Sequence, residues 1–164
     1  MRIISMSALC ASLWLAALGL PAASLQAQSP QPPYWATIRY DKVYMRVGPG
    51  VTYPIDWVYA REGLPVRVIR KREGWRLVVD PDGAQGWIAA SQLRRERGVI
   101  VTGEELAVMR EGPQAGSPVR FRAEPGVVGR LVGCSSDWCE IDVAGRTGWV
   151  PAERLWGDEE PSQP

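Results

Sequence analysis

The sequence contains the same set of motifs twice, and this repeat constrains the fold more than any other feature. Gly-x-x-Gly-Trp followed by a β-branched residue occurs at 83–88 and again at 145–150, so Trp87 and Trp149 lie 62 positions apart. Four further segments recur in the same order, with spacings that agree within one residue: MRVGPG with MREGPQ, YPIDWV with SPVRFR, EGLPVRVI with EPGVVGRLV, and GWRLVV with DWCEID. Five motifs in register indicate a tandem duplication of a unit of about 60 residues.

Each unit has the pattern of a small β-structure. Short runs of Val, Ile, Trp and Tyr alternate with Gly, Pro and Asp, and 17 Gly and 14 Pro residues disfavour long helices. We predict an all-β fold of two tandem small closed β-barrels, unit 1 (35–97) and unit 2 (98–157). The strands expected in unit 1 lie near 42–46, 54–60, 65–70, 75–80 and 86–89.

Both ends of the chain are expected to lie outside the barrels. Residues 1–27 have a charged start at Arg2, a short apolar run and then small residues, which is typical of a secretory signal peptide. We expect cleavage after Ala27, with cleavage after Ser24 as the less favoured alternative. An uncleaved membrane anchor is the alternative, and it would be the only contact with a membrane. Residues 28–34 are expected to form a linker, and the polar residues 158–164 a disordered tail. The mature chain is therefore expected to be periplasmic or secreted.

The repeated motifs resemble the bacterial SH3-like domain family, in a tandem subtype found in cell-envelope proteins of Gram-negative bacteria. The matching residues are Arg46, Gly48, Pro49, Tyr53, Pro54, Trp75, Gly83, Gly86, Trp87 and Leu93 in unit 1, and Arg110, Gly112, Pro113, Pro118, Trp138, Gly145, Gly148, Trp149 and Leu155 in unit 2. Tyr44 and Val108 depart from the family pattern, which often has Asn there, and Asp137 replaces a Gly. The resemblance implies a role in binding cell-wall material or in protein interaction.

Structural roles account for the repeated motif itself. Gly83 and Gly86 are expected to allow a turn that needs positive φ. Trp87 and Trp149 are expected to be mainly packing residues, because a barrel this small depends on each large aromatic side chain.

Charge and aromatic residues distinguish the two units. Unit 1 has 12 Lys and Arg against 7 Asp and Glu, a net charge of +5, whereas residues 98–164 have 6 against 11, a net charge of −5. The positive unit either attracts its negative neighbour or faces an anionic partner. All five tyrosines lie in or just before unit 1. Their positions reflect either β-propensity or a stacking surface, and the sequence does not show whether they are exposed. The candidate ligand-binding residues are Tyr44, Tyr53, Trp57, Tyr59, Arg70, Lys71 and Arg72.

The sequence offers no catalytic constellation. It has no histidine, hence no imidazole base, no Ser-His or Cys-His pair and no ordinary zinc site, and no metal or cofactor is expected. Cys134 and Cys139 flank Ser-Ser-Asp-Trp, an expected hairpin tip, and facing residues there lie within disulfide range. We predict a disulfide between them. A metal site is the alternative, but no third ligand is evident.

Two functional hypotheses remain. The first is a non-catalytic exported binding module that contacts peptidoglycan or another anionic cell-wall component, a glycan or a peptide, mainly through unit 1. The second is a structural scaffold that binds envelope proteins and has no small ligand. Nucleic acid is not an expected partner of an exported protein.

Overall fold

The computed structural model describes residues 30–160. The signal segment and its cleavage site, predicted within 1–27, lie outside the described residues, as do residues 161–164. Within the described part of the chain, no helix combines the length and the apolar character needed to cross a membrane.

Apart from two single-turn 3-10 segments, the regular structure is β-structure, so the all-β prediction is confirmed. Unit 1 contains β1 (Tyr34–Ile38), β2 (Val43–Arg46), β3 (Ile55–Tyr59), β4 (Pro65–Arg72), β5 (Trp75–Val79), β6 (Gln85–Ala89), η1 (Ala90–Gln92) and β7 (Leu93–Arg94). Unit 2 contains β8 (Gly98–Val101), β9 (Ala107–Arg110), β10 (Val119–Ala123), β11 (Val128–Ser135), β12 (Trp138–Val143), β13 (Arg146–Pro151), η2 (Ala152–Arg154) and β14 (Leu155–Trp156).

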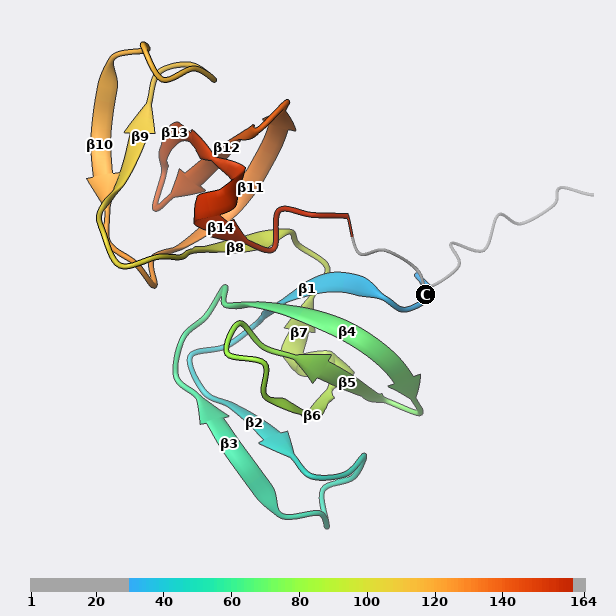
Figure 1. The fold of residues 1–164 in the computed structure, drawn as a ribbon. Helices are drawn as coiled ribbons and strands as arrows, with labels where there is room; N and C mark the ends of the chain where they lie inside the picture. Colours follow the sequence, from blue (N-terminus) through green and yellow to red (C-terminus); the bar gives the residue numbers. More distant parts are fainter. Residues whose placement is uncertain (1–29, 161–164) are drawn as a thin grey trace, which may run out of the picture.

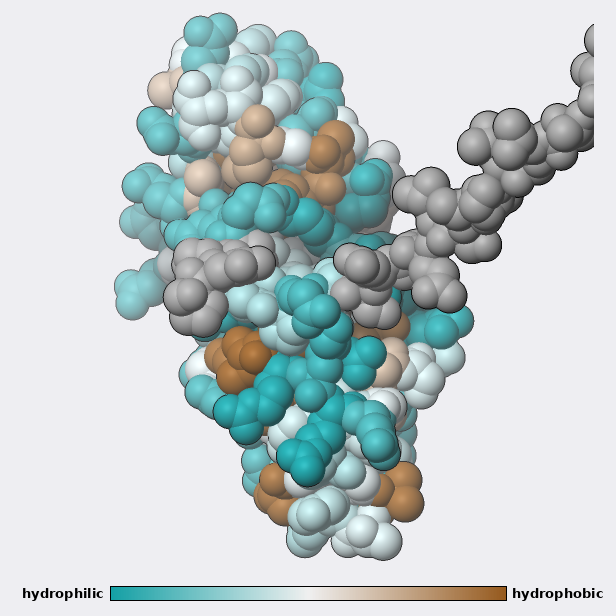
Figure 2. Space-filling view, turned by 90° about the vertical axis from the view of Figure 1, so that its right-hand side faces the viewer, coloured by the Kyte–Doolittle hydropathy of each residue, from teal (hydrophilic) through white to brown (hydrophobic). Residues whose placement is uncertain are grey.

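The two units have the same strand topology. Each forms a 7-stranded antiparallel sheet, in the order β3-β2-β6-β5-β4-β1-β7 in unit 1 and β10-β9-β13-β12-β11-β8-β14 in unit 2. The units lie one above the other (Figure 1), which gives the molecule an elongated outline (Figure 2). The five strands predicted for unit 1 match β2 to β6, whereas β1 and β7 precede and follow the repeated motifs.

Each unit has its own hydrophobic core. Period-two alternation selects the core residues, so that in β2 Val43 and Met45 are buried while Tyr44 and Arg46 are half-buried. The core of unit 1 contains Ala36, Ile38, Val43, Met45, Tyr59, Val66, Val68, Val78 and Ile88. The core of unit 2 contains Val99, Val101, Ala107, Met109, Ala123, Cys139, Ile141, Val150 and Leu155.

The glycines of the repeated motif have two different functions. Gly83 and Gly145 both have φ of 84°, so they form the turns that need left-handed backbone. Gly86 and Gly148 do not have positive φ, and for Gly86 the expectation was wrong. They allow close approach instead: a Cβ on Gly86 would lie 2.4 Å from Met45 Cγ, and one on Gly148 would lie 2.8 Å from Met109 Cβ. Gly86 and Gly148 therefore let β6 and β13 pack closely against core methionines.

Tyr59 is a core residue of unit 1 and not a stacking candidate. Its side chain is 5 % exposed, and its hydroxyl donates to Asp80 Oδ2 at 2.9 Å. Asp80 Oδ1 also accepts from the backbone N–H groups of Asp82 and Ala84, so one buried carboxylate closes the turn after β5. The pKa of the Tyr59 phenol is raised far above its ordinary value. Burial is the largest cause, and the hydrogen bond to Asp80 and the negative charges of nearby carboxylates add to it.

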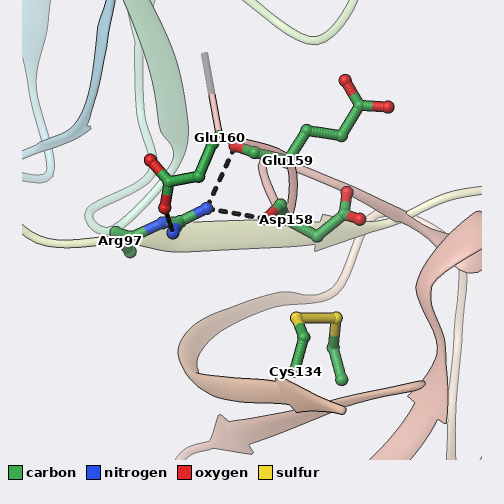
Figure 3. The surroundings of a disulfide bond; sticks show 6 residues. Arg97, Cys134, Asp158, Glu159 and Glu160 are labelled. Atoms are coloured by element: carbon green, nitrogen blue, oxygen red, sulfur yellow. Dashed lines mark hydrogen bonds and ion pairs between the residues drawn. A yellow bond between two sulfur atoms is a disulfide. The ribbon is translucent and has the colours of Figure 1, made fainter. Parts of the chain in front are cut away.

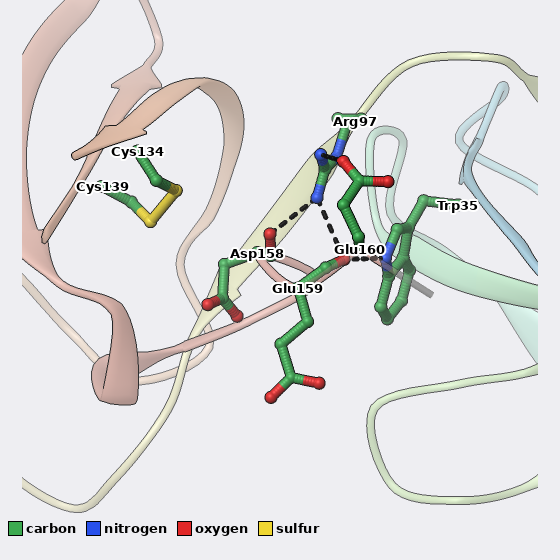
Figure 4. A network of polar contacts seen from close by, with 7 residues as sticks. All are labelled: Trp35, Arg97, Cys134, Cys139, Asp158, Glu159 and Glu160. Atoms are coloured by element: carbon green, nitrogen blue, oxygen red, sulfur yellow. Dashed lines mark hydrogen bonds and ion pairs between the residues drawn. A yellow bond between two sulfur atoms is a disulfide. The ribbon is translucent and has the colours of Figure 1, made fainter. Parts of the chain in front are cut away.

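Residues 158–160, expected to belong to a disordered tail, cross from unit 2 to unit 1 and bind there. The indole N–H of Trp35 on β1 donates to the Glu159 carbonyl at 2.6 Å, and the Trp35 ring packs edge-to-face on Trp156 with centroids 4.7 Å apart. Arg97 binds the Glu160 carboxylate and the carbonyls of Asp158 and Glu159 (Figure 4). We call residues 158–160 the clasp, because they connect the two units.

The junction is close-packed around glycines. A Cβ on Gly157 would lie 2.6 Å from the Gly98 carbonyl oxygen, so the chain passes directly beside β8 as it enters the clasp. Arg61 of unit 1 also binds the Gly126 carbonyl of unit 2. Burial raises the pKa of the Asp158 carboxyl above its ordinary value, to which the charge of Glu159 contributes.

The predicted disulfide is confirmed. Cys134 and Cys139 face each other across the β11–β12 hairpin with Cα atoms 4.0 Å apart, and they are joined by a disulfide bond. The bond lies in unit 2, and Figure 3 shows it together with Arg97 and residues 158–160. Its Cys139 end is buried in the core, so the bond attaches the hairpin to that core.

Candidate functional site

A hollow on unit 1 brings together side chains from four separate segments. Its volume is about 650 Å³, and it is lined by Pro49, Tyr53, Arg72, Glu73, Trp75 and Trp87. Pro49 and Tyr53 come from the loop between β2 and β3, Arg72 and Glu73 from the end of the β4–β5 hairpin, Trp75 from β5 and Trp87 from β6. We call this the aromatic hollow.

Glycine and arginine position the Tyr53 side of the hollow. A Cβ on Gly48 would lie only 2.3 Å from Tyr53 Cδ1, so the tyrosine ring rests directly on the glycine backbone. Arg46 donates to the Tyr53 carbonyl at 2.7 Å, which holds the loop against β2. Tyr53 remains 45 % exposed, so part of its ring is available to a ligand.

Strand alternation places the two tryptophans on the outer face of the sheet. Ile88 is fully buried, so its neighbour Trp87 must point away from the core, and Trp87 is half-buried against the hollow. Trp149 is half-buried for the same reason, because its neighbour Val150 is in the core. Trp87 and Trp149 were expected to be packing residues of the cores, but both lie outside the cores. Trp75 pairs with Arg72 across the β4–β5 hairpin, so an indole and a guanidinium lie side by side at the rim.

The charges of the hollow are not neutralised within the described residues. Arg72 and Glu73 are exposed, and between residues 30 and 160 neither takes part in an ion pair. A guanidinium that is free of carboxylate partners is a ready donor to a carboxylate or phosphate ligand. The hollow thus combines three aromatic rings with one free cation and one carboxylate.

The equivalent surface of unit 2 has different chemistry. When the two repeats are aligned, Ser117 of unit 2 corresponds to Tyr53 of unit 1. The hairpin pair Ser135 and Trp138 corresponds to Arg72 and Trp75. Ser117 is buried, so it offers no stacking surface. In the part of the chain that the structure describes, two hollows border Trp138. One is lined by Asp137, Pro151, Ala152 and Glu153, and the lining of the other includes Glu105, Arg110, Glu153 and Arg154. Only unit 1 combines a tyrosine and an arginine at this position.

The structure places two of the sequence-predicted binding residues in the hollow. These are Tyr53 and Arg72. Tyr44 is half-buried on β2, with the Lys42 ammonium 5.6 Å from its ring centroid, and Trp57 is 58 % exposed on β3 away from the hollow. Trp57 and Tyr59 lie on the same face of β3. Only the Tyr59 end of that strand lies over the barrel interior, so Tyr59 is in the core.

The remaining basic candidates do not line the hollow. Arg70 is exposed on β4, two residues before Arg72. Lys71 points the other way and donates to the Pro30 carbonyl at 3.0 Å, so it binds the segment that precedes β1. Of the three consecutive basic residues, only Arg72 borders the aromatic rings.

Sequence reasoning missed four residues of the hollow. Pro49 and Trp75 are named only among the residues that match the family pattern, Trp87 is expected to be a packing residue, and Glu73 is not among the candidates. The signal for Trp87 was available, because a Trp next to a core Ile in a strand must face outward. The same part of the chain, residues 30–160, contains no group of three His, Cys, Asp or Glu residues placed to hold a metal ion.

Comparison with known proteins identifies the class. The model of the bacterial SH3 domain family matches residues 39–95 and 103–157, one match in each unit, which covers more than half of the chain. The chain therefore belongs to the bacterial SH3 domain family, as a tandem repeat.

Individual proteins add little to this assignment. No curated protein matches the chain. Among solved structures, NlpC2 from Trichomonas vaginalis has 12 % identity and a TM-score of 0.34, and covers 78 % of this chain and 49 % of its own. NlpC1 from Trichomonas vaginalis has 12 % identity and a TM-score of 0.34, and the match covers 79 % of this chain and 47 % of NlpC1. An NlpC/P60 family protein from Bacillus cereus has 14 % identity and a TM-score of 0.35, and the match covers 80 % of this chain and 59 % of that protein. The chain spans about half the length of these structures, and a likeness this weak assigns no activity to it.

Proposed function

We propose that the chain is a non-catalytic exported binding module whose aromatic hollow binds peptidoglycan or another anionic cell-wall component. The observation that carries the proposal is the juxtaposition in one hollow of Tyr53, Trp75 and Trp87 with Arg72, which has no ion-pair partner among residues 30–160. Aromatic faces offer flat apolar surfaces with a polar edge, which suits a sugar ring or a peptide. The guanidinium of Arg72 suits a peptide carboxylate.

The charge distribution supports an anionic ligand. The net charge of +5 on unit 1 attracts wall carboxylates at long range, while the −5 of residues 98–164 does not. Arg72 is exposed to solvent, so its contact with a ligand contributes at most about 1 kcal/mol and weakens as salt rises. Affinity is therefore modest, and the aromatic contacts provide most of the selectivity.

The proposal includes no turnover. The hollow contains a single carboxylate, Glu73, and no Ser, Thr, Cys or Lys to act as a nucleophile. One acid without a second acid or a base is insufficient for general acid–base chemistry. The segment 1–27 would deliver the chain to the periplasm or the outside, where cell-wall ligands are found.

A variant that gives the hollow the residues of unit 2 tests the proposal. Tyr53→Ser with Arg72→Ser reproduces Ser117 and Ser135, and should reduce retention of the chain on purified cell-wall sacculi. Arg67→Ser is the matched control, because Arg67 is exposed on the same strand but outside the hollow. Retention that falls equally in both variants would show that net charge alone controls binding, and the proposed site would be wrong.

A scaffold role is the second candidate, and one observation favours it. Strand β3 exposes Ile55, Trp57 and Val58 at the edge of its sheet. An exposed apolar edge strand is a typical surface for pairing with another protein chain.

A further inference from the structure

Strand β3 has an open outer edge. It is the first strand in the sheet order of unit 1, and among residues 30–160 it pairs only with β2. Ile55, Trp57 and Val58 are 47 %, 58 % and 43 % exposed. The hydrophobic surface at the lower end of Figure 2 belongs to the end of the molecule where Figure 1 places β2 and β3. An open edge presents unpaired backbone N–H and C=O groups to a further strand, and the charges beside it decide which strand can pair there.

The equivalent edge of unit 2 carries charges that β3 lacks. Strand β10 is also the first strand of its sheet, and it presents the exposed residues Arg120 and Arg122 on either side of Phe121. At the same positions β3 has Asp56 and Val58 beside Trp57. The two repeats therefore differ at their free edges in the sign of the charge: β3 carries one negative charge and β10 carries two positive charges.

Charge selects among the three ways in which β3 and β10 of two copies can pair. Pairing β3 with β3 brings together two units of charge +5. Pairing β10 with β10, centred on Phe121, sets Arg120 opposite Arg122, and like charges directly opposite each other destabilise a strand pair. Pairing β3 with β10 brings the unit of charge +5 to the residues of charge −5. With Trp57 opposite Phe121, Asp56, the extra residue of a β-bulge in β3, lies beside Arg122. Only the mixed pair is favourable in both long-range and local charge.

We propose that copies of this chain associate head to tail, with β3 of one copy adding antiparallel to the outer edge of β10 of the next copy. Strands β3 and β10 lie toward opposite ends of the molecule (Figure 1), so each copy keeps one edge free after the other has paired. Assembly through such a heterologous contact continues until it closes into a ring or forms an open chain.

The contact is a weak one. Each strand has five residues, so the buried area falls below the roughly 1,200 Å² of a stable interface. Association therefore depends on protein concentration and on salt. The proposal does not depend on the aromatic hollow, which Trp57 does not line.

Sedimentation velocity of the chain from residue 28 onward, over a wide range of concentrations, tests this inference. The weight-average sedimentation coefficient should rise continuously without a plateau at dimer, and should fall again as salt is added. A coefficient that stays at the monomer value, or that levels off at a dimer, would overturn the proposal.

Charge reversal identifies the strands. Asp56→Arg and Arg122→Asp should each weaken association about tenfold, because each replaces an attraction by a repulsion. The double variant restores an opposite-charge pair and should recover association. The matched control combines Asp82→Arg, at an exposed turn of unit 1, with Arg122→Asp, and should show no recovery.

Val58→Lys provides a second, independent variant. The lysine protects the β3 edge and faces Arg120 of the next copy, so it should abolish association while the amide spectrum of unit 1 stays folded. Retention on sacculi should not fall in Val58→Lys, which separates this contact from wall binding. Failure of the Asp56–Arg122 double variant to recover association would refute the proposed pairing.

Discussion

Tyr53 rests on Gly48 so closely that a Cβ on the glycine would lie 2.3 Å from Cδ1 of the ring. The equivalent glycine of unit 2, Gly112, has a looser neighbour, since a Cβ there would lie 3.0 Å from Ser117 Oγ. The same repeated glycine therefore supports an aromatic wall in unit 1 and only a buried hydroxyl in unit 2. This difference between the repeats is the basis of the proposed binding site.

Gly48→Ala should displace the Tyr53 ring from the aromatic hollow and reduce binding to sacculi. The backbone at Gly48 does not have positive φ, and the clash is with the ring of a partly exposed side chain and not with backbone, so the free energy of unfolding should change by about 1 kcal/mol or less. Gly112→Ala is the matched control and should bind like the unmodified chain. Equal binding by the two variants would show that the position of Tyr53 is irrelevant.

The buried Tyr59–Asp80 pair predicts loss of stability in alkali. The folded state raises the pKa of the Tyr59 phenol, so its contribution to stability is complete below the unfolded pKa of about 10 and is lost as pH rises above it. The tyrosinate absorbance of Tyr59 should appear only together with unfolding of unit 1. In Tyr59→Phe that part of the absorbance change should be missing. Ionisation of all five tyrosines before any loss of circular dichroism would contradict the buried assignment.

The repeat pattern predicted the strands more reliably than it predicted the environment of each side chain. Strands β2 to β6 follow from alternation and turn residues, which are local signals. Trp57 and Tyr59 share a strand face, yet one is exposed and the other buried, because the barrel interior covers only the Tyr59 end of β3. The period of a strand defines its faces but not which part of a face is covered.

Contacts between residues distant in sequence were not predictable. The Trp35 indole binds the carbonyl of Glu159, 124 residues away, within a segment whose polar composition indicated disorder. Composition describes what a segment can do alone and does not report a binding surface formed by two folded units. The disulfide, in contrast, was predictable, because Cys134 and Cys139 lie within one hairpin.

The clasp should fix the orientation of the two units. Ending the chain at Gly157 removes the carbonyls and the carboxylate that Arg97 and Trp35 bind, whereas ending it at Glu160 retains them. Residual dipolar couplings should fit one alignment tensor for the longer chain and require two for the shorter chain. A single tensor for both chains would show that the remaining junction contacts suffice.

The Cys134–Cys139 disulfide should stabilise unit 2 alone. It closes a small loop, so chain entropy predicts a contribution of about 2 kcal/mol. Cys134→Ser with Cys139→Ser should lower the free energy of unfolding reported by the amides of unit 2 and leave that of unit 1 unchanged. An equal loss in both units would indicate that they unfold as one cooperative body.

Titration of the chain with soluble peptidoglycan fragments, followed through the indole N–H signals of the tryptophans, tests the central claim most directly. Trp75 and Trp87 line the aromatic hollow, whereas Trp138 and Trp149 occupy the equivalent positions in unit 2 and serve as the internal control. We predict saturable shifts of the Trp75 and Trp87 signals that weaken with salt, and no comparable shifts of Trp138 and Trp149. Equal shifts in both units, or none in either, would contradict the assignment of the aromatic hollow as the binding site.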